Sequence, residues 1–433
     1  MANIIYYGAG ENASINFDKF IKKTSEPSCF VDADTCKHYT EFNQGKYIIL
    51  PLNIAINKYP DYELWLTPTL DKLSSITKYL LDLGIPKEKI KYFQDVEYRY
   101  GCAHLGKLLV VHTDGIRPCC NVKGKFIKYD EKILTEQSLP RYILKYNQWL
   151  DDTLNRLRVG KPTDCDGCSE LLLEMWPKKP KIEWLNAGAR FADTLCNCRC
   201  VYCLQRDTAF SNKSIQLLNA YDIHRILYDI YGNAIIGTDL VDGEITVISY
   251  RDKLLDLIIS NGWNASIATN AIVYNEKIAK IMQRPRSRLS VSLDCGTVET
   301  YKRIKGVNAF NKVVNNLNKY ALRNAKIDLK YILLPGFNDN LKDVAGFVEI
   351  AKKINVFRVT ISNDLLNGAG NPNRKSEQDI PNSEIEILKQ LVKLCKEKNI
   401  VVTISPGCFT KADCKRLLNI IKNDSTASAQ SRS

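Results

Sequence analysis

Four cysteines stand within eight residues at Cys196-Asn-Cys198-Arg-Cys200-Val-Tyr-Cys203, shortly after the strand-like segment KIEWLN at 181–186. Within this run, Cys196, Cys200 and Cys203 have the spacing CxxxCxxC. Thiolates are the usual protein ligands of iron–sulfur clusters, and this spacing lets a single loop supply three corners of a four-iron cluster. The fourth iron then keeps an open coordination position, which catalytic metal sites offer to a substrate or cofactor. The run therefore predicts a [4Fe–4S] cluster.

Strand patterns alternate with helix patterns around this motif, from about residue 181 to 405. The strand-like segments are KIEWLN (181–186), AIIGTDLV (234–241), ASIATN (265–270), RLSVSLD (288–294), KIDLKYILL (326–334), FRVTIS (357–362) and IVVTIS (400–405). Helical segments between them include 249–261, 274–283, 308–322, 339–353 and 382–397. Such alternation forms a parallel sheet. Six units of this length predict an α/β fold, a partial (βα)6 barrel of the TIM type, with its site at the C-terminal ends of the strands.

With this context, the motif resembles that of the radical S-adenosylmethionine (SAM) superfamily. The family has an aromatic residue just before the last cysteine, and Tyr202 stands there. The resemblance implies that the open iron binds the amino and carboxylate groups of SAM. It also implies that one electron from the cluster cleaves SAM into methionine and a 5′-deoxyadenosyl radical, which abstracts a hydrogen atom from a substrate.

The segments that follow the second and fourth strands resemble the family's SAM-binding segments. Gly243-Glu244 is similar to the end of a Gly-Gly-Glu segment that holds the methionine amino group, with Asp242 in place of the first glycine. Val291-Ser-Leu-Asp294 with Arg303 resembles a VSLDG…R pattern. In that pattern the serine contacts the ribose and the arginine pairs with the methionine carboxylate, for which a guanidinium fork is well shaped. The SAM contacts that the resemblance implies are Tyr202, Gly243, Glu244, Ser292, Asp294 and Arg303.

Two cysteines near these segments have alternative interpretations. Cys295 directly follows a strand end, where a thiol could return a hydrogen atom to a substrate radical, but a buried or incidental cysteine is the alternative. Cys198 lies outside the CxxxCxxC spacing, and we expect it not to be a ligand. For the three motif cysteines the alternative is a structural zinc site, although the paired CxxC…CxxC pattern typical of zinc is missing.

A second group of cysteines precedes the barrel. Cys102-x12-Gly115-x4-Cys120 resembles the CxnGx4C element of the family's SPASM and twitch modules, and the group also includes Cys119 and Cys165-Asp-Gly-Cys168. In the family this module usually follows the barrel. Cys102, one of Cys119 and Cys120, Cys165 and Cys168 could hold an auxiliary [4Fe–4S] cluster that relays an electron or anchors substrate. A zinc site and the absence of any metal are the alternatives.

The first ninety-odd residues predict a small Rossmann-like α/β domain. Gly8-x-Gly10-x-x-Ala13 follows the strand NIIYYG and opens a helical pattern, and Asp32 stands about twenty residues further on, as in a dinucleotide-binding fingerprint. The alternative is a glycine turn needed only for close packing of strand and helix. The predicted divisions are a Rossmann-like domain at 1–95, a twitch-like cysteine-rich segment at 96–180, the barrel at 181–405 and a C-terminal extension with a disordered end at 406–433.

Composition restricts the cellular setting. The chain has 433 residues, 15 cysteines and a net charge of +13. Neither a signal peptide nor an apolar run long enough to cross a bilayer is evident, so we expect a cytoplasmic protein whose cysteines serve metals or redox chemistry rather than disulfides. The basic residues are scattered, so a solvated surface is favoured over a nucleic-acid partner.

Two functional hypotheses from different classes follow. The first is a radical SAM enzyme that acts on a peptide or on a sugar or nucleotide, with a reductant such as flavodoxin or ferredoxin as partner and no membrane. The second is a non-catalytic binding or redox-sensing protein stabilised by an iron–sulfur or zinc site. A scaffold of the second kind does not require Glu244, Ser292 or Arg303. An NAD-dependent oxidoreductase is a third alternative, but the first domain is too short to carry a substrate domain of its own.

Overall fold

A computed structural model of the chain describes residues 2–112, 114–119, 127–131, 134–168, 170–187, 195–203, 218–241, 243–364, 380–405 and 408–423. The chain forms two compact units, Met1–Gly106 with Trp149–Lys181, and Lys107–Gln148 with Ile182–Ser433. We call them the head unit and the barrel unit. The segment 96–180, predicted to stand between the two domains, is therefore shared between them. Some strands of this segment pair within the head unit and others pair within the barrel unit. Local sequence patterns do not reveal this division, because strand partners are distant in sequence.

The head unit contains a six-stranded sheet in the order β3-β4-β2-β1-β5-β6. All its neighbouring strands run parallel except β3 and β4. The strands are β1 (Asn3–Tyr7), β2 (Cys29–Val31), β3 (Glu41–Phe42), β4 (Tyr47–Leu50), β5 (Tyr62–Leu66) and β6 (Ile90–Tyr92), and the helices are α1 (Glu11–Ile15), α2 (Phe17–Lys23), α3 (Leu52–Lys58) and α4 (Leu70–Asp82).

Both faces of this sheet are buried. Because side chains alternate along a strand, Ile5 and Tyr7 of β1 join a core with Ala55 of α3 and Leu73 of α4. Tyr6, between them, joins a second core with α1 and α2. This explains why the strands are nearly continuous apolar runs, as is typical of a parallel sheet covered on both sides.

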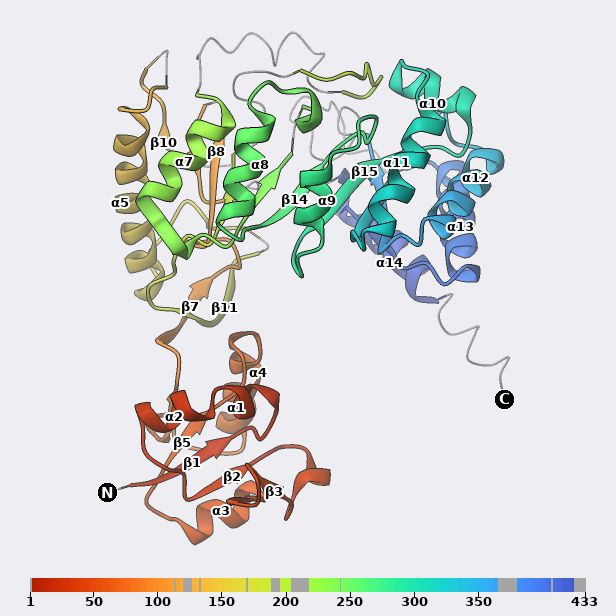
Figure 1. The fold of residues 1–433 in the computed structure, drawn as a ribbon. Helices are drawn as coiled ribbons and strands as arrows, with labels where there is room; N and C mark the ends of the chain where they lie inside the picture. Colours follow the sequence, from red (N-terminus) through yellow and green to blue (C-terminus); the bar gives the residue numbers. More distant parts are fainter. Residues whose placement is uncertain are drawn as a thin grey trace, which may run out of the picture. The chain divides into compact units, whose positions relative to one another are not determined.

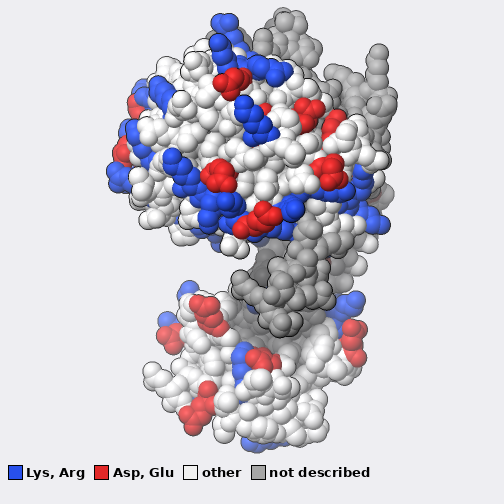
Figure 2. Space-filling view, turned by 90° about the vertical axis from the view of Figure 1, so that its right-hand side faces the viewer, with Lys and Arg blue, Asp and Glu red and all other residues white. Residues whose placement is uncertain are grey.

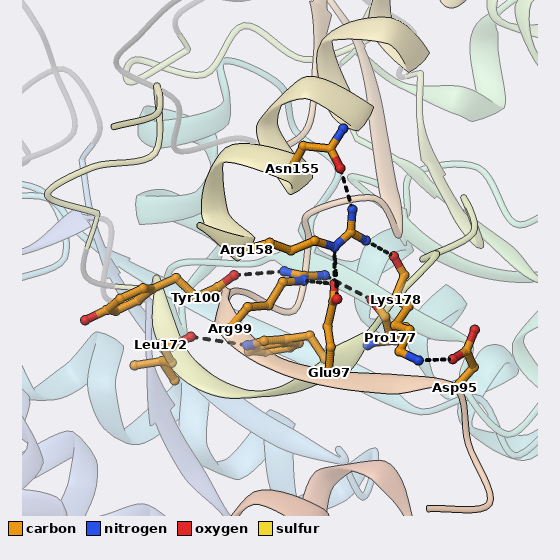
Figure 3. Close-up of polar contacts among 10 residues, drawn as sticks. Asp95, Glu97, Arg99, Tyr100, Asn155, Arg158, Leu172, Pro177 and Lys178 are labelled. Atoms are coloured by element: carbon orange, nitrogen blue, oxygen red, sulfur yellow. Dashed lines mark hydrogen bonds and ion pairs between the residues drawn. The ribbon is translucent and has the colours of Figure 1, made fainter. Parts of the chain in front are cut away.

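A two-stranded antiparallel ribbon, β7 (Val96–Gly101) with β11 (Leu172–Pro177), also belongs to the head unit. Its buried Arg99 donates to the Glu97 carboxylate at 2.9 Å and to the carbonyls of Tyr100 and Pro177. Arg158, at the end of α5 (Leu139–Arg158), donates to the same Glu97 carboxylate at 2.8 Å, so this carboxylate lies between two guanidinium groups (Figure 3). These contacts attach the ribbon to the end of α5.

The barrel unit is built on a ten-stranded sheet in the order β10-β9-β8-β12-β13-β14-β15-β16-β17-β18. From β12 to β18 every neighbouring pair is parallel, which confirms the predicted α/β fold and its barrel-type strand order. The strands are β8 (Leu108–His112), β9 (Gly115–Arg117), β10 (Ile127–Lys128), β12 (Trp184–Asn186), β13 (Gly237–Leu240), β14 (Asn264–Ala268), β15 (Arg288–Ser292), β16 (Ile327–Leu333), β17 (Arg358–Asn363) and β18 (Val402–Ile404).

Strand β8 shows where the predicted organisation and the structure differ. The segment KLLVVH was assigned to the cysteine-rich segment, but β8 pairs in parallel with β12 and so extends the barrel sheet. Four consecutive residues of β8, from Leu108 to Val111, are buried. Burial on both faces explains their uniform apolarity.

Helices alternate with the barrel strands and lie along the outside of the sheet (Figure 1). In α12 the buried Val344, Phe347, Val348 and Ala351 recur at helical spacing, and the Asn340 side chain caps the helix by accepting from the amide of Asp343. The helices are α7 (Ala220–Tyr231), α8 (Arg251–Ser260), α9 (Glu276–Met282), α10 (Val298–Lys305), α11 (Phe310–Leu322), α12 (Leu341–Lys353), α13 (Asn382–Glu397) and α14 (Lys411–Asn423).

The surface carries both signs of charge. On the face of the barrel unit that Figure 2 presents, lysine and arginine side chains lie among aspartate and glutamate side chains. Among the described residues, no helix is both long and apolar enough to cross a bilayer.

Acidification should expose the cost of burying His224 in α7. Its Nδ1 lies 2.6 Å from the Ala220 carbonyl oxygen and its Nε2 lies 2.7 Å from the Thr238 hydroxyl. Burial lowers the pKa of His224 to about 4, although the bond to Ala220 opposes this shift. The unfolded chain, with a histidine pKa of about 6.5, then binds a proton that the folded chain does not bind. The contribution of neutral His224 to the free energy of unfolding is therefore fully present above about pH 6.5. It falls by about 1.4 kcal/mol per pH unit as the pH drops to about 4.

The His224→Gln variant cannot titrate at this position and serves as the control. Urea unfolding of both chains at about pH 7.5 and about pH 5 should show that the free-energy advantage of the wild type over the variant shrinks by about 2 kcal/mol. Equal losses in the two chains would contradict this assignment.

Candidate active site

One cavity of about 530 Å³ opens in the barrel unit at the carboxyl ends of the parallel strands. This is the edge at which barrel folds of this type place their sites. The residues that line it come from the cysteine loop, from the end of α10, and from the ends of six strands or the segments just after them: Cys196, Cys198, Cys200, Tyr202, Cys203, Gly243, Glu244, Ala268, Thr269, Asn270, Ser290, Ser292, Lys305, Lys330, Ile332, Ser362, Asn363, Ser405 and Cys408.

The four cysteines of the loop line the same cavity. A hydrogen bond from the Cys198 thiol is the main cause that lowers the pKa of Cys196 to about 6 and that of Cys200 to about 7. Among the described residues, no three His, Cys, Asp or Glu side chains already converge on a single metal position. The donor set nevertheless fits an iron–sulfur cluster, because thiolates are the ligands such clusters require.

The cysteine loop is attached to the C-terminal end of α10 by its backbone. The amide of Arg199 donates to the Lys305 carbonyl at 2.8 Å, and the amide of Val201 donates to the Ile304 carbonyl at 2.9 Å. Gly306 follows with φ +69°, and a Cβ there would lie 2.9 Å from Cβ of Arg199. Glycine is therefore required both by the backbone conformation and by the close approach of the loop.

A buried ion pair lies beneath the loop. Lys305 Nζ is 2.5 Å from Asp294 Oδ2, and both side chains are almost fully buried. The Tyr202 hydroxyl donates to the same carboxylate oxygen at 2.7 Å and accepts from Lys305. Burial by itself lowers the pKa of Lys305, but the charge of Asp294, the charge of Cys200 and the hydrogen bond to Asp294 together more than offset this effect, and the pKa is raised. Burial and the Asp294 charge also raise the pKa of Tyr202.

Glu244 is also a buried carboxylate, but unlike Asp294 it is held by uncharged hydrogen-bond donors. Its Oε1 accepts from the amide and hydroxyl of Thr246 and from the hydroxyl of Thr269 at 2.8 Å, while Oε2 accepts from the amide of Asn270 at 2.6 Å. No cation neutralises Glu244 in the ion pairs of the described residues. Its carboxylate therefore lies in the cavity wall with uncharged partners.

Most of the predicted SAM contacts meet at this cavity. Tyr202, Gly243, Glu244 and Ser292 line it, and Asp294 lies buried behind its wall. Arg303 does not line it: its guanidinium donates to the Gly336 carbonyl at 2.8 Å and lies over the Phe337 ring.

Cys295 also lies apart from the cavity lining. Its thiol is fully buried and lies 3.5 Å from the Leu293 carbonyl oxygen and 3.6 Å from that of Thr297. Burial raises the pKa of this thiol. The described geometry therefore matches the alternative of a buried cysteine more closely than that of a hydrogen donor.

Sequence reasoning missed several lining residues that follow strand ends. Asn270, after β14, donates to Asn197 at 2.6 Å and to the Cys196 sulfur at 3.7 Å, so it supports the cysteine loop. Lys330 on β16 and Lys305 at the end of α10 were also missed. The signal that could have found Asn270 is its place beyond the carboxyl end of a barrel strand, where polar residues serve the site rather than the core.

The other predicted site residues lie elsewhere. Cys102, Cys165 and Cys168 belong to the head unit and Cys119 to the barrel unit, whereas Cys120 lies outside the described residues. Gly8 and Gly10 belong to the turn between β1 and α1, where Gly8 has φ +104°, and Ala13 lies buried within α1. Asp32 accepts hydrogen bonds from the amides of Ala9 and Asp34 and pairs with Lys37, so its carboxylate is used to hold its own loop.

Comparison with known proteins shows which family the region around the motif is similar to. Residues 194–351 match the model of the Radical SAM superfamily, which confirms the predicted resemblance. A GTP 3′,8-cyclase of Clostridium perfringens is 26% identical over 212 residues, which cover 48% of this chain and 61% of that protein. An uncharacterized protein of Methanocaldococcus jannaschii is 27% identical over 264 residues, 57% of this chain and 79% of its own length.

Solved structures show a more distant likeness. SuiB of Streptococcus suis, in its crystal structure bound to S-adenosylmethionine, is 14% identical with a TM-score of 0.37, and the match covers 52% of this chain and 47% of that one. The chain spans about three fifths of the length of the cyclase.

Removing the lysine of the buried pair should destabilise the barrel unit more than removing both charges. Lys305→Met leaves the Asp294 carboxylate buried without a counter-charge, a change that costs about 3–5 kcal/mol. The double variant Asp294→Asn/Lys305→Met leaves no buried charge, and its loss should be less than half as large. Urea unfolding of the three chains measures this difference. Equal stability of the single and double variants would show that the pair does not act as a unit.

Proposed function

We propose that the chain is an enzyme that cleaves SAM reductively and uses the resulting radical to abstract hydrogen from a substrate. The match of residues 194–351 to the Radical SAM superfamily model supports this proposal. One observation carries the proposal. The thiols of Cys196, Cys200 and Cys203 line the same cavity as Glu244 and Ser292, at the carboxyl edge of the parallel sheet. A structural metal site has no need of a cavity with a carboxylate in its wall.

We propose that Cys196, Cys200 and Cys203 hold a [4Fe–4S] cluster. When bound, the cluster supplies an open iron for SAM and the single electron that splits SAM into methionine and the 5′-deoxyadenosyl radical. The chain positions these thiols through the backbone bonds from Arg199 and Val201 to the end of α10. Asn270 supports the loop from the side of β14.

The cavity wall supports SAM binding by charge and by hydrogen bonding. Thr246, Thr269 and Asn270 hold the Glu244 carboxylate in one position, so its charge can attract the methionine ammonium without first being reorganised. Ser292, on β15, lines the same cavity with a hydroxyl that can bond the ribose. In this proposal Asp294 acts as a positioning residue, because Lys305 and Tyr202 occupy its carboxylate.

The substrate and the reductant belong to the same proposal. The curated cyclase relative acts on GTP by its name, so nucleotides are the first substrates to test, followed by sugars and peptides. The cluster needs an external one-electron donor, for which flavodoxin or ferredoxin are suitable candidates. The rival candidate is a scaffold that holds the cluster without cleaving SAM, and it predicts SAM binding or none, but no cleavage product.

A second metal site is proposed for the head unit. Gly101 at the end of β7 pairs with Leu172 at the start of β11, and this pairing brings Cys102 and the segment that contains Cys165 and Cys168 to the same end of the ribbon. The amide of Cys168 donates to the Cys165 carbonyl, which forms a tight turn. We propose that these three thiols bind an auxiliary iron–sulfur cluster, with zinc as the alternative metal.

Anaerobic reconstitution with iron and sulfide, followed by SAM and dithionite, should yield 5′-deoxyadenosine from the wild-type chain. The Cys196→Ala/Cys200→Ala/Cys203→Ala variant should yield none, because it lacks the ligands of the cluster. Cys198→Ala is the matched control and should keep the activity. Chromatographic quantification of 5′-deoxyadenosine measures the outcome with and without GTP. A wild-type chain that binds its cluster and SAM but forms no product under either condition would favour the scaffold.

Elemental analysis tests the auxiliary site. Cys165→Ser/Cys168→Ser should lower the iron content of the reconstituted chain by about four atoms, whereas Cys36→Ser, an exposed cysteine of the same unit, should not change it. A loss of zinc instead of iron would identify the alternative metal. Unchanged iron and zinc would refute a metal site at these cysteines.

A further inference from the structure

A second cavity lies wholly within the head unit, apart from the radical chemistry proposed above. Its volume is about 330 Å³, within the range of small-ligand sites. It is lined by residues that follow β1 and β5 and by residues after β6: Asn12, Asn16, Lys19, Phe20, Lys23, Leu66, Thr67, Pro68, Phe93 and Gln94.

The position of this cavity in the sheet is informative. From β1 the chain moves to β2 on one side, and it later returns to β5 on the other side of β1. The carboxyl ends of β1 and β5 therefore form the topological switch point of the sheet. Open parallel sheets bind their ligands in the crevice at such a point. The loop after β5 and the helices after β1 both line the cavity, so it occupies this crevice.

One wall of the cavity is a chain of hydrogen bonds. The Asn12 side-chain amide donates to the Thr67 carbonyl, the Asn16 amide donates to Asn12 Oδ1 at 3.0 Å, and Lys19 Nζ donates to Asn16 Oδ1 at 3.3 Å. These hydrogen bonds hold the polar groups of α1 and α2 in place at the end of β5. The Lys19 ammonium group carries three N–H donors and uses one of them here, so the others remain for a ligand.

The cavity lining is positively charged. Lys23 Nζ is fixed by the Phe93 carbonyl at 2.5 Å, and Lys19 by an asparagine oxygen, so both lysines have neutral partners. No lining residue is acidic. Two ammonium groups without a carboxylate among the lining side chains attract an anion, and a phosphate group accepts several such donors at once.

The same geometry argues against the dinucleotide expected from the glycine motif. Asp32, which would bind a ribose hydroxyl in that motif, accepts from the amides of Ala9 and Asp34 and pairs with Lys37. None of Gly8, Gly10, Ala13 and Asp32 lines the cavity. The crevice therefore suits a small anion rather than a dinucleotide.

We propose that the head unit binds a small phosphate ester at the β1–β5 switch point, with Lys19 and Lys23 as the residues that hold the phosphate. The proposal is independent of the cysteine clusters, because its cavity lies within residues 12–94.

Isothermal titration calorimetry on the full reconstituted chain tests the proposal, with ribose 5-phosphate as the probe and ribose and succinate as controls. The wild type should bind ribose 5-phosphate and should not measurably bind ribose or succinate. Lys19→Ala/Lys23→Ala should weaken binding at least about tenfold, because two charge-assisted contacts are lost. Lys72→Ala/Lys78→Ala removes the same charge from α4, outside the cavity, and should bind as the wild type does.

Three results would overturn the proposal: no binding of ribose 5-phosphate by the wild type, equal weakening in both double variants, or succinate bound as tightly as the phosphate ester. Lys19→Ala alone removes only one bond to the Asn16 side chain and is expected to fold normally. A smaller weakening in this variant therefore separates lost phosphate contacts from misfolding. Unchanged 5′-deoxyadenosine formation in all variants would show that the radical site is intact.

Discussion

The buried ion pair between Asp294 and Lys305 is the interaction on which the arrangement of the active-site cavity depends. Two charges withdrawn from water cost several kcal/mol each, and only close contact with further hydrogen bonds offsets that cost. Here the contact is 2.5 Å, Tyr202 bonds to both partners, and the amide of Ile332 donates to the second Asp294 oxygen. Because these residues come from the loop after β15, from α10, from the cysteine loop and from β16, the pair joins four segments at one point.

The pairing also decides which charges face the cavity. Asp294, behind the wall, and Lys305, in the wall, neutralise one another, so neither is available as an independent charge. Glu244 is held by hydroxyl and amide groups alone and has no cationic partner among the described ion pairs. The rigid, neutral support around it is the kind of preorganisation that strengthens an electrostatic contact in a partly enclosed site. Structural and functional carboxylates are thus distinguished by their partners, although both are buried.

The head unit shows how segments distant in sequence complete one core. Met175 of β11 packs with Leu64 and Leu80 of the sheet and its helix, and its amide donates to the Ser74 hydroxyl. The chain thus returns to the head unit after it has supplied β8, β9, β10 and the first half of α5 to the barrel unit. On β7, Arg99 donates to the Pro177 carbonyl of the returning strand, and Glu97 accepts from Arg158 at the end of α5 (Figure 3).

Local patterns in the sequence determined the elements themselves: the parallel strands, the helices between them, the α/β class and the cysteine motif, because periodicity and spacing are properties of neighbouring residues. Long-range partners were decided only by the tertiary structure. It joined β8 to β12, turned Arg303 toward Gly336 rather than the cavity, and brought Lys305 to Asp294. Arg303 and Lys305 are both basic residues of one helix, and the sequence does not distinguish their roles. A step of two residues turns a side chain to a different face of the helix, so only the packing of α10 decides which of the two is buried.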